Sequence, residues 1–213
     1  MTNRLQIIFS AIPECEVFAD VGCDHGYIAD AVLKSGKCKR VVLSDISAKC
    51  LNKAEILLQE EILNGRATAV VSNGLEKVGK VDCALIAGMG GMEIISILKN
   101  APHLPQKLVL QPMKNTPELR KFLLEIGYAF LSDRVFFAED KYYQLLTLEK
   151  GKDSLNDQEI KYGRDNVKER GKDFVDMLNK NLADYEKILR SIDESNPARA
   201  QILSAMEEMK QYV

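Results

Sequence analysis

Short apolar segments recur along the first half of the chain, and each is followed by a stretch with helical periodicity. The apolar segments lie at 17–21, 40–45, 67–71, 81–87 and 107–111. The helical stretches that follow lie at 26–35, 47–63, 91–99 and 116–126. Strands that alternate with helices predict βαβ units, and therefore a parallel sheet of five strands.

The pattern changes after Gly127. The segment "YAFLSDRVFFAEDKYYQLLTLEK" indicates two long strands around the turn "AEDK", and such a hairpin would close the sheet. Tyr142 and Tyr143 are consecutive in the second of these strands, so one ring is expected in the core and the other on the opposite face. The whole pattern predicts a Rossmann-like α/β fold with a seven-stranded sheet that contains an antiparallel member.

The C-terminal part of the chain is polar and helical from residue 151 onward. Apolar residues at 160, 167 and 174, and then at 178, 185 and 192, keep heptad spacing with one shift. Pro197 ends this helix, and a second helix is expected over 198–212. We therefore predict a catalytic domain over 1–150 and a segment, 151–213, in which residues 154–213 form a coiled-coil-like helical hairpin.

The turn after the first strand is rich in glycine and acid. It reads Asp20-x-Gly22-x-Asp24-x-Gly26, which differs from the GxGxxG pattern that cradles a pyrophosphate. Carboxylates would repel a diphosphate but suit a ligand with a cationic end, such as the ammonium and sulfonium of S-adenosylmethionine. The alternative is a strand-to-helix turn in which the acids only cap the helix.

Two later strand ends supply further candidates for a nucleoside. Asp45 lies about twenty residues beyond the turn, where an acid binds ribose hydroxyls, although it could equally cap the next helix beside Ser47. In "SNGL", Asn73 could pair with adenine, while Leu75 or Ile46 covers the face of the base. An Asn-Gly pair can also be a simple tight turn.

A third glycine-rich segment, "IAGMGGMEI", leaves the fourth strand. Gly88, Gly90 and Gly91 lie at the carboxyl end of a central strand, next to the switch point where ligands bind in open α/β sheets. Backbone without side chains lets a flat base approach closely. The same glycines could instead serve close packing of the helix against the first strand, and the two roles are compatible.

Composition restricts the class of protein. Apolar residues make up 46% of the 213 positions and the net charge is −2, so the chain can bury a core and is not basic overall. No apolar run has the length of about 20 residues that a membrane span needs. The cysteines at 15, 23, 38, 50 and 83 form no CxxC pair, which favours a reduced cytoplasm and no metal site. The basic segment 34–40 is expected to be a solvated face away from the cleft.

The motifs together resemble one family. "DVGCDHGYIA", "SNGL", "IAGMGG", "LVLQPMKNTPELRKFL" and "EDKYYQLL" are similar, in this order, to the bacterial tRNA (adenine-22-N1)-methyltransferase family, also called TrmK. The match runs through residues 1 to 150, and the family also has a helical C-terminal extension. The resemblance implies a class I methyltransferase fold, S-adenosylmethionine as cofactor and tRNA as partner, with no membrane or metal; it leaves the oligomeric state open.

The resemblance also implies roles for individual residues. The methionine end of the cofactor would be held by Asp20, Gly22, Asp24, His25 and Gly26. The ribose would be held by Asp45 and the adenine by Asn73 and Gly74, with Asn73 replacing an Asp that is usual in the family. The methyl group would pass over Gly88, Met89, Gly90 and Gly91.

The remaining candidates concern the RNA. Gln111, Pro112 and His25 are candidates for contact with the target base, although His25 is equally expected to be structural. Lys114, Arg120 and Lys121 follow the fifth strand on the cleft side and are candidates for tRNA phosphates. The alternatives are a small-molecule methyltransferase and a non-catalytic protein that keeps the fold, while the missing GxGxxG disfavours an NAD oxidoreductase.

Overall fold

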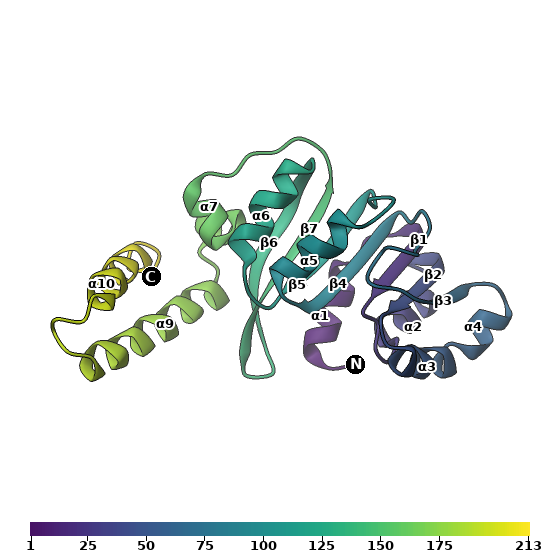
Figure 1. Cartoon of the computed structure of the whole chain (residues 1–213), viewed down its shortest axis with the longest axis horizontal. Helices are drawn as coiled ribbons and strands as arrows, with labels where there is room; N and C mark the ends of the chain where they lie inside the picture. The colour runs from purple at the N-terminus through teal and green to yellow at the C-terminus, as the bar shows by residue number, and fades with distance from the viewer.

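The computed structural model describes residues 1–213, and it has one sheet with helices on both faces (Figure 1). The strands are β1 (Cys15–Val21), β2 (Cys38–Asp45), β3 (Ala67–Val71), β4 (Cys83–Met89), β5 (Lys107–Pro112), β6 (Tyr128–Ala138) and β7 (Lys141–Lys150). The helices are α1 (Asn3–Ala11), α2 (Tyr27–Lys34), α3 (Ala48–Leu57), α4 (Gln59–Leu63), α5 (Gly91–Lys99), α6 (Thr116–Glu125), α7 (Asp157–Tyr162), α8 (Arg164–Glu169), α9 (Lys172–Ser191) and α10 (Ala198–Met209).

The sheet has seven strands in the order β3-β2-β1-β4-β5-β7-β6. The first five are parallel, and β7 pairs antiparallel with both β5 and β6. This confirms the predicted sheet and its closing hairpin. The chain leaves β1 toward β2 and later returns to β4 on the other side of β1, so the switch point lies between β1 and β4.

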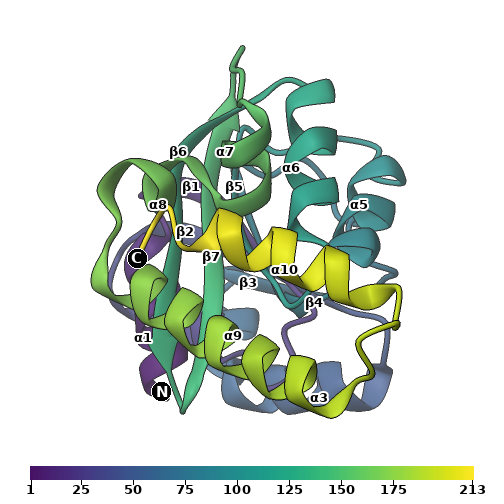
Figure 2. The ribbon, with the colours of Figure 1, turned by 90° about the vertical axis from the view of Figure 1, so that its left-hand side faces the viewer.

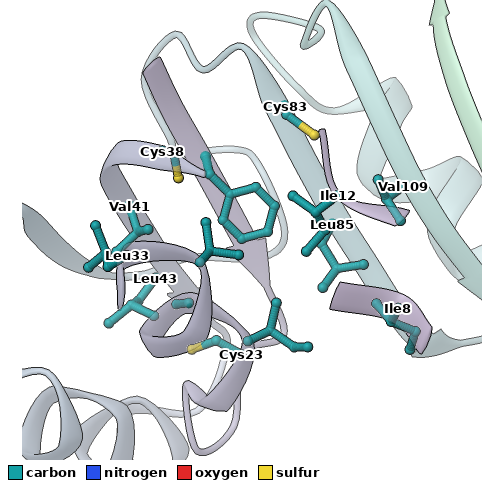
Figure 3. Packing of buried hydrophobic residues seen from close by; sticks show 14 of the residues in the cluster. Ile8, Ile12, Cys23, Leu33, Cys38, Val41, Leu43, Cys83, Leu85 and Val109 are labelled. Carbon is teal, nitrogen blue, oxygen red and sulfur yellow. The ribbon is translucent and has the colours of Figure 1, made fainter. Parts of the chain in front are cut away.

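The two faces of the sheet have separate apolar cores. One core joins α1, α2 and α3 to the sheet and contains Ile8, Phe18 and Leu85, and the other joins α5 and α6 and contains Ile86 and Leu119. Figure 3 shows Ile8 of α1, and Ile12 just after this helix, beside Leu85 and Val109. The sequence pattern did not predict α1, and this helix closes the face of the sheet next to the switch point.

Two predicted helices are interrupted in the structure. The stretch 47–63 divides at Leu58 into α3 and α4. The first arm of the predicted hairpin divides into α7, α8 and α9, with breaks at Gly163 (φ 93°) and at Arg170 (φ 49°). Heptad spacing alone did not reveal these breaks, because it registers only the positions of apolar residues and not the backbone angles at Gly163 and Arg170.

The segment around α7 and α8 is bonded to the edge of the sheet. Strand β6 is an edge strand, and its outward amides at residues 133, 135 and 137 donate to side-chain oxygens of Asp165, Asn166 and Asp173 at 2.9–3.0 Å. Unpaired edge amides invite pairing with other chains, and these side chains satisfy them. Residues 165–173 therefore complete the sheet instead of forming a separate unit.

Helices α9 and α10 form the hairpin proper. They lie at the end of the molecule opposite α3 and α4 (Figure 1), and α10 runs alongside α9 (Figure 2). Phe174 and Leu178 of α9 pack with Met206 and Met209 of α10, and Val135 of β6 joins this cluster. None of the helices in the chain combines the length and the apolar composition that a bilayer span requires.

Candidate active site

The turn between β1 and α2 has a backbone that requires its glycines. Gly22 and Gly26 have φ of 71° and 72°, a region that disfavours residues with a Cβ. A Cβ at Gly26 would lie 2.8 Å from the Cβ of Ala54, and one at Gly22 would collide with the end of the Met89 side chain. The amides of Gly22 and Cys23 both donate to the Ser44 carbonyl, at 2.7 and 3.2 Å. The turn is therefore fixed between β2, α3 and the end of β4.

Asp20 is the most unusual charge in the turn. Its side chain is only 5% exposed, and no basic side chain forms an ion pair with it. Burial raises the pKa of Asp20 to about 7, with a further rise from Asp45 and an opposing hydrogen bond from the Ala29 amide. A buried carboxylate without a counter-ion is costly, so this position favours a cationic ligand.

Asp24 and His25 are more exposed, and both contact another charged residue. Asp24 Oδ1 accepts from Lys53 Nζ at 3.0 Å, and His25 Nε2 lies 3.4 Å from the same ammonium. The His25 ring is stacked on Tyr27, with centroids 5.2 Å apart. Lys53 was not predicted as part of the site, because nothing in the sequence relates it to an acid 29 positions earlier.

A cavity of about 320 Å³ lies above this turn. Its walls include Asp20, Gly22, Asp24 and His25 from the turn, and Arg4 from α1. The other predicted cofactor residues do not line it. The structure thus brings four of the five candidates for the methionine end together in one cavity, all except Gly26, and adds α1 as a wall.

Asp45 bonds to the backbone around it. Its Oδ2 accepts from the Asp24 amide at 3.3 Å and its Oδ1 from the Ser47 amide at 2.8 Å. Ser47, and not Asp45, provides the side-chain cap of α3 through the Cys50 amide. Asp45 therefore links the end of β2 to the turn between β1 and α2 by a hydrogen bond, and its carboxylate lies beside the turn that lines the cavity.

The residues predicted for adenine have different environments. Ile46 is 72% exposed and free to cover a base, whereas Leu75 is 1% exposed within the core of α5 and α6. Leu75 therefore cannot cover a base, and that prediction is wrong. The Asn73 amide donates to Glu76 at 2.7 Å, and Gly74 approaches Ile97 so closely that a Cβ would lie 2.5 Å from it.

The glycine segment after β4 makes close contact with the loop after β5. Gly88 has φ 78°, and the register with β5 shifts between Ala87 and Met89. The Gly91 amide donates to the Lys114 carbonyl at 2.7 Å, and a Cβ at Gly91 would collide with the Asn115 carbonyl. A Cβ at Gly90 would lie 3.1 Å from the Lys114 side chain. Gly90 and Gly91 thus permit close packing on the loop after β5, and not on the first strand as the packing interpretation expected.

Gln111 is buried and bonded within the protein. Its Oε1 accepts from Arg4, at 3.0 Å from Nε, and its Nε2 donates to the Pro112 carbonyl at 3.2 Å. Arg4 also lies over the Tyr143 ring at 5.2 Å. The Gln111 amide is thus engaged on both sides and is not available to the target base, contrary to the prediction. Pro112 lines a second cavity beyond it.

Arg120 is not an RNA contact. It is 0% exposed and forms a two-pronged pair with Asp133, at 2.7 and 2.8 Å, and it also donates to Gln144 and to the Ile160 carbonyl. A buried guanidinium cannot reach a phosphate, so the prediction is wrong. Lys114 and Lys121 are exposed and form no ion pair.

Known proteins show the same fold and domain. Residues 1–146 match the protein family described as "Methyltransferase domain". The chain is 30% identical over 156 residues to the tRNA (adenine(22)-N(1))-methyltransferase of Bacillus subtilis (strain 168), which covers 71% of this chain and 66% of that relative. The alignment thus spans slightly less than two thirds of that relative's length.

Solved structures extend the likeness to the whole chain. M. capricolum TrmK, in complex with S-adenosyl-homocysteine, is similar with a TM-score of 0.87 at 26% identity, over 100% of this chain and 97% of that one. A Streptococcus pneumoniae structure has the same fold, with a TM-score of 0.92 at 24% identity over 100% and 99% of the two chains.

The seven-stranded sheet, the cavity at its switch point and the matched domain define a methyltransferase of the Rossmann-like, S-adenosylmethionine-dependent class. Within this class, the chain belongs to the tRNA (adenine-22-N1)-methyltransferase family, TrmK. The resemblance carried by the sequence motifs is confirmed.

Proposed function

We propose that the chain transfers a methyl group from S-adenosylmethionine to N1 of an adenine in tRNA, at position 22 as in its relatives. The observation that carries this function is Asp20, a buried carboxylate with no counter-ion in the cavity at the switch point. A site for a dinucleotide would place phosphates at this turn, and the Asp20 carboxylate would repel them.

The residues of the cavity fit this cofactor. Asp20 can accept from the ammonium of the methionine end, and Gly22 lines the same cavity without a side chain that would fill it. Asp45 can accept from ribose hydroxyls with oxygens that now bond only backbone amides. Ile46 can cover adenine, and Asn73 can pair with its edge if it exchanges its bond to Glu76.

The methyl transfer depends on alignment of the reactants more than on proton transfer. The cofactor, when bound, supplies a methyl group on a sulfonium. Adenine N1 is a neutral lone pair, so no base is needed to activate it, and correct placement can contribute several orders of magnitude in rate. N1 lies on the Watson–Crick edge, so the base must be unpaired to enter the site.

Backbone of the glycine segment would provide the surface for this step. Gly88 to Gly91 are held against the loop after β5, and carbonyl oxygens there can stabilise the positive charge that develops on the base. Pro112 and Met113 form the adjoining wall, with the Met113 amide donating to the Met89 carbonyl at 2.8 Å. His25 stays a candidate for contact with the base.

We assign the chemistry to residues 1–150 and assistance in tRNA binding to residues 151–213. The shape of the α9–α10 hairpin supports this assignment, and exposed Lys114 and Lys121 would add tRNA contacts from the catalytic part. A tRNA substrate would also favour a cytoplasmic location.

The function is tested by incubating the protein with unmodified tRNA and isotopically labelled cofactor, followed by mass spectrometry of the nucleosides. We expect labelled 1-methyladenosine, and none from a transcript in which guanine replaces adenine 22. Failure to methylate any tRNA by a protein that binds S-adenosylhomocysteine would contradict the proposed substrate.

A further inference from the structure

A second cavity lies between the loop after β5 and the hairpin. It has a volume of about 250 Å³, and its walls come from residues 112–117, from Tyr142 and Gln144 of β7, and from Met177 of α9. We call it the Tyr142 groove. It connects the catalytic part of the chain with the first helix of the hairpin.

The groove adjoins the glycine segment. Pro112, at one end of the groove, is the register partner of Met89 in the neighbouring strand. Lys114 lines the groove with its side chain, and its carbonyl accepts from the Gly91 amide at 2.7 Å. A ligand in the groove would therefore be continuous with one that lies over Gly88 to Gly91.

The chemistry of the groove suits a nucleobase with its phosphate. Tyr142 is half-buried and offers a ring, and Met177 offers a polarizable thioether that packs well on aromatic faces. Lys180 of α9 lies 6.0 Å from the centre of the Tyr142 ring, and Lys114 is an exposed residue of the groove lining. The lining contains no Asp or Glu, so no acid repels a polyanion.

We propose that the Tyr142 groove binds one unstacked base of the substrate RNA, the neighbour of the target adenine, by stacking on Tyr142. This inference rests on the proposed function. Sites for drug-sized ligands measure about 300–1,000 Å³, so the volume fits a single base and not a longer segment. Lys180, which lies over the ring, and Lys114, which lines the groove, pair with the phosphates on either side of that base.

The binding of tRNA by Tyr142→Leu, Tyr142→Phe and Phe137→Leu tests the groove. Phe137 is the matched control, because its ring lies 4.9 Å from Tyr142 on the paired strand but does not line the groove. Stacking on an aromatic side chain is worth about 1–3 kcal/mol per base, so Tyr142→Leu should weaken binding roughly tenfold. Tyr142→Phe and Phe137→Leu should bind tRNA as the wild type does.

A tRNA with 2-aminopurine beside adenine 22 provides the second readout. Stacking on Tyr142 should change its fluorescence with the wild type and with Tyr142→Phe, and this change should be absent with Tyr142→Leu. The affinity for S-adenosylhomocysteine should be the same in all variants, since none lines the cofactor cavity.

The two proposals fail differently. A wild type that binds this tRNA with the fluorescence change but does not methylate it contradicts the proposed function and leaves the groove supported. Equal tRNA affinity of wild type and Tyr142→Leu overturns the groove as an RNA site and favours a protein partner there. Equal losses in Tyr142→Leu and Phe137→Leu also overturn it, because they would show a general disturbance of the β6–β7 hairpin.

Discussion

Asp20 and Asp133 are both buried carboxylates, but their surroundings differ. Asp133 is 1% exposed and receives two hydrogen bonds from the Arg120 guanidinium, while Asp20 is 5% exposed and receives none from a cation. Burial raises the pKa of both side chains, and only for Asp133 does a guanidinium oppose that rise. The protein provides a counter-ion at one site and leaves it to a ligand at the other.

This difference separates a structural ion pair from a binding site. Around Arg120, the pair joins α6 to β6, and further bonds to Gln144 and to the end of α7 unite the sheet with the C-terminal segment. Asp20, in contrast, lines a cavity. A buried charge whose partner is missing is therefore the more informative signal of function.

The largest expected effect is on stability, when Asp133 loses the Arg120 guanidinium as its partner. Arg120→Leu leaves Asp133 buried and unpaired, which should reduce the free energy of unfolding by about 3–5 kcal/mol. Denaturant titration measures this change. The double variant Arg120→Leu/Asp133→Leu should recover much of the loss, because an apolar pair replaces the ion pair.

Lys121→Leu is the control, because Lys121 is the exposed neighbour of Arg120. It should change the free energy of unfolding by less than about 0.5 kcal/mol. A loss of similar size in Lys121→Leu would show that the helix surface, and not the ion pair, determines the result.

The next largest effect concerns Asp20, for which the ammonium of the ligand is the expected partner. Asp20→Asn should weaken binding of S-adenosylhomocysteine by about 1.5–3 kcal/mol, the usual contribution of a hydrogen bond to a charged group. Burial raises the pKa of Asp20 in the folded protein to about 7. The free energy of unfolding therefore falls as pH rises to that value and the buried carboxyl becomes ionised. At pH 8 the neutral amide should therefore leave the ligand-free protein at least as stable as the wild type.

Calorimetry and thermal unfolding without ligand distinguish the two roles. Unchanged affinity in a folded Asp20→Asn variant would remove Asp20 from the cofactor site. A large loss of stability would show that Asp20 is structural in the same sense as Asp133.

The sequence predicted the sheet well, because its signals are local. Alternating apolar segments and helical stretches give the positions of the first five strands along the chain, and the turn around Glu139 and Asp140 gives the hairpin. The glycines at 22 and 26 were also recognisable, since their positive φ angles restrict the residue type at those positions.

The ion pair could not be predicted, because it depends on a bulge. The register of β6 with β7 shifts between Phe130 and Ser132, so the side chains that face α6 change from even to odd positions. Asp133 thereby meets Arg120 instead of solvent. Simple alternation from Phe130 would have placed Ser132 there, and Arg120 would have remained a plausible surface cation.

The role of α1 was missed for a related reason. Arg4 meets Gln111 and Tyr143 only in the folded chain, across more than one hundred positions of sequence. A nine-residue helix with a polar first turn carries too weak a periodic signal to be placed against the sheet. Contacts between distant segments of this kind need a structure.

A smaller effect follows from the titration of Asp20. Below pH 7 the carboxyl of the ligand-free protein takes up a proton, which must be released before it can accept from the ligand's ammonium. Affinity for S-adenosylhomocysteine should therefore rise roughly tenfold between pH 6 and pH 7.5, while the amino-acid ammonium of the ligand stays protonated. Calorimetry across this range with the wild type and Asp20→Asn measures it. The variant should show a flat profile, and an equal slope in both proteins would assign the titration to another group.

The same distinction between paired and unpaired charges applies to surface lysines. Lys34 and Lys39 pair with Asp30 and Glu16, whereas Lys114 and Lys121 form no ion pair. Cations without a partner are the better candidates for RNA phosphates, although each surface pair is worth little by itself.

We expect Lys114→Glu/Lys121→Glu to weaken tRNA binding and to flatten its dependence on salt by about one unit for each lost contact. The matched variant Lys34→Glu/Lys39→Glu reverses as many charges and should change the salt dependence little. Binding measured over a series of salt concentrations decides between them, and a larger effect from the paired lysines would place the RNA on the opposite edge of the sheet.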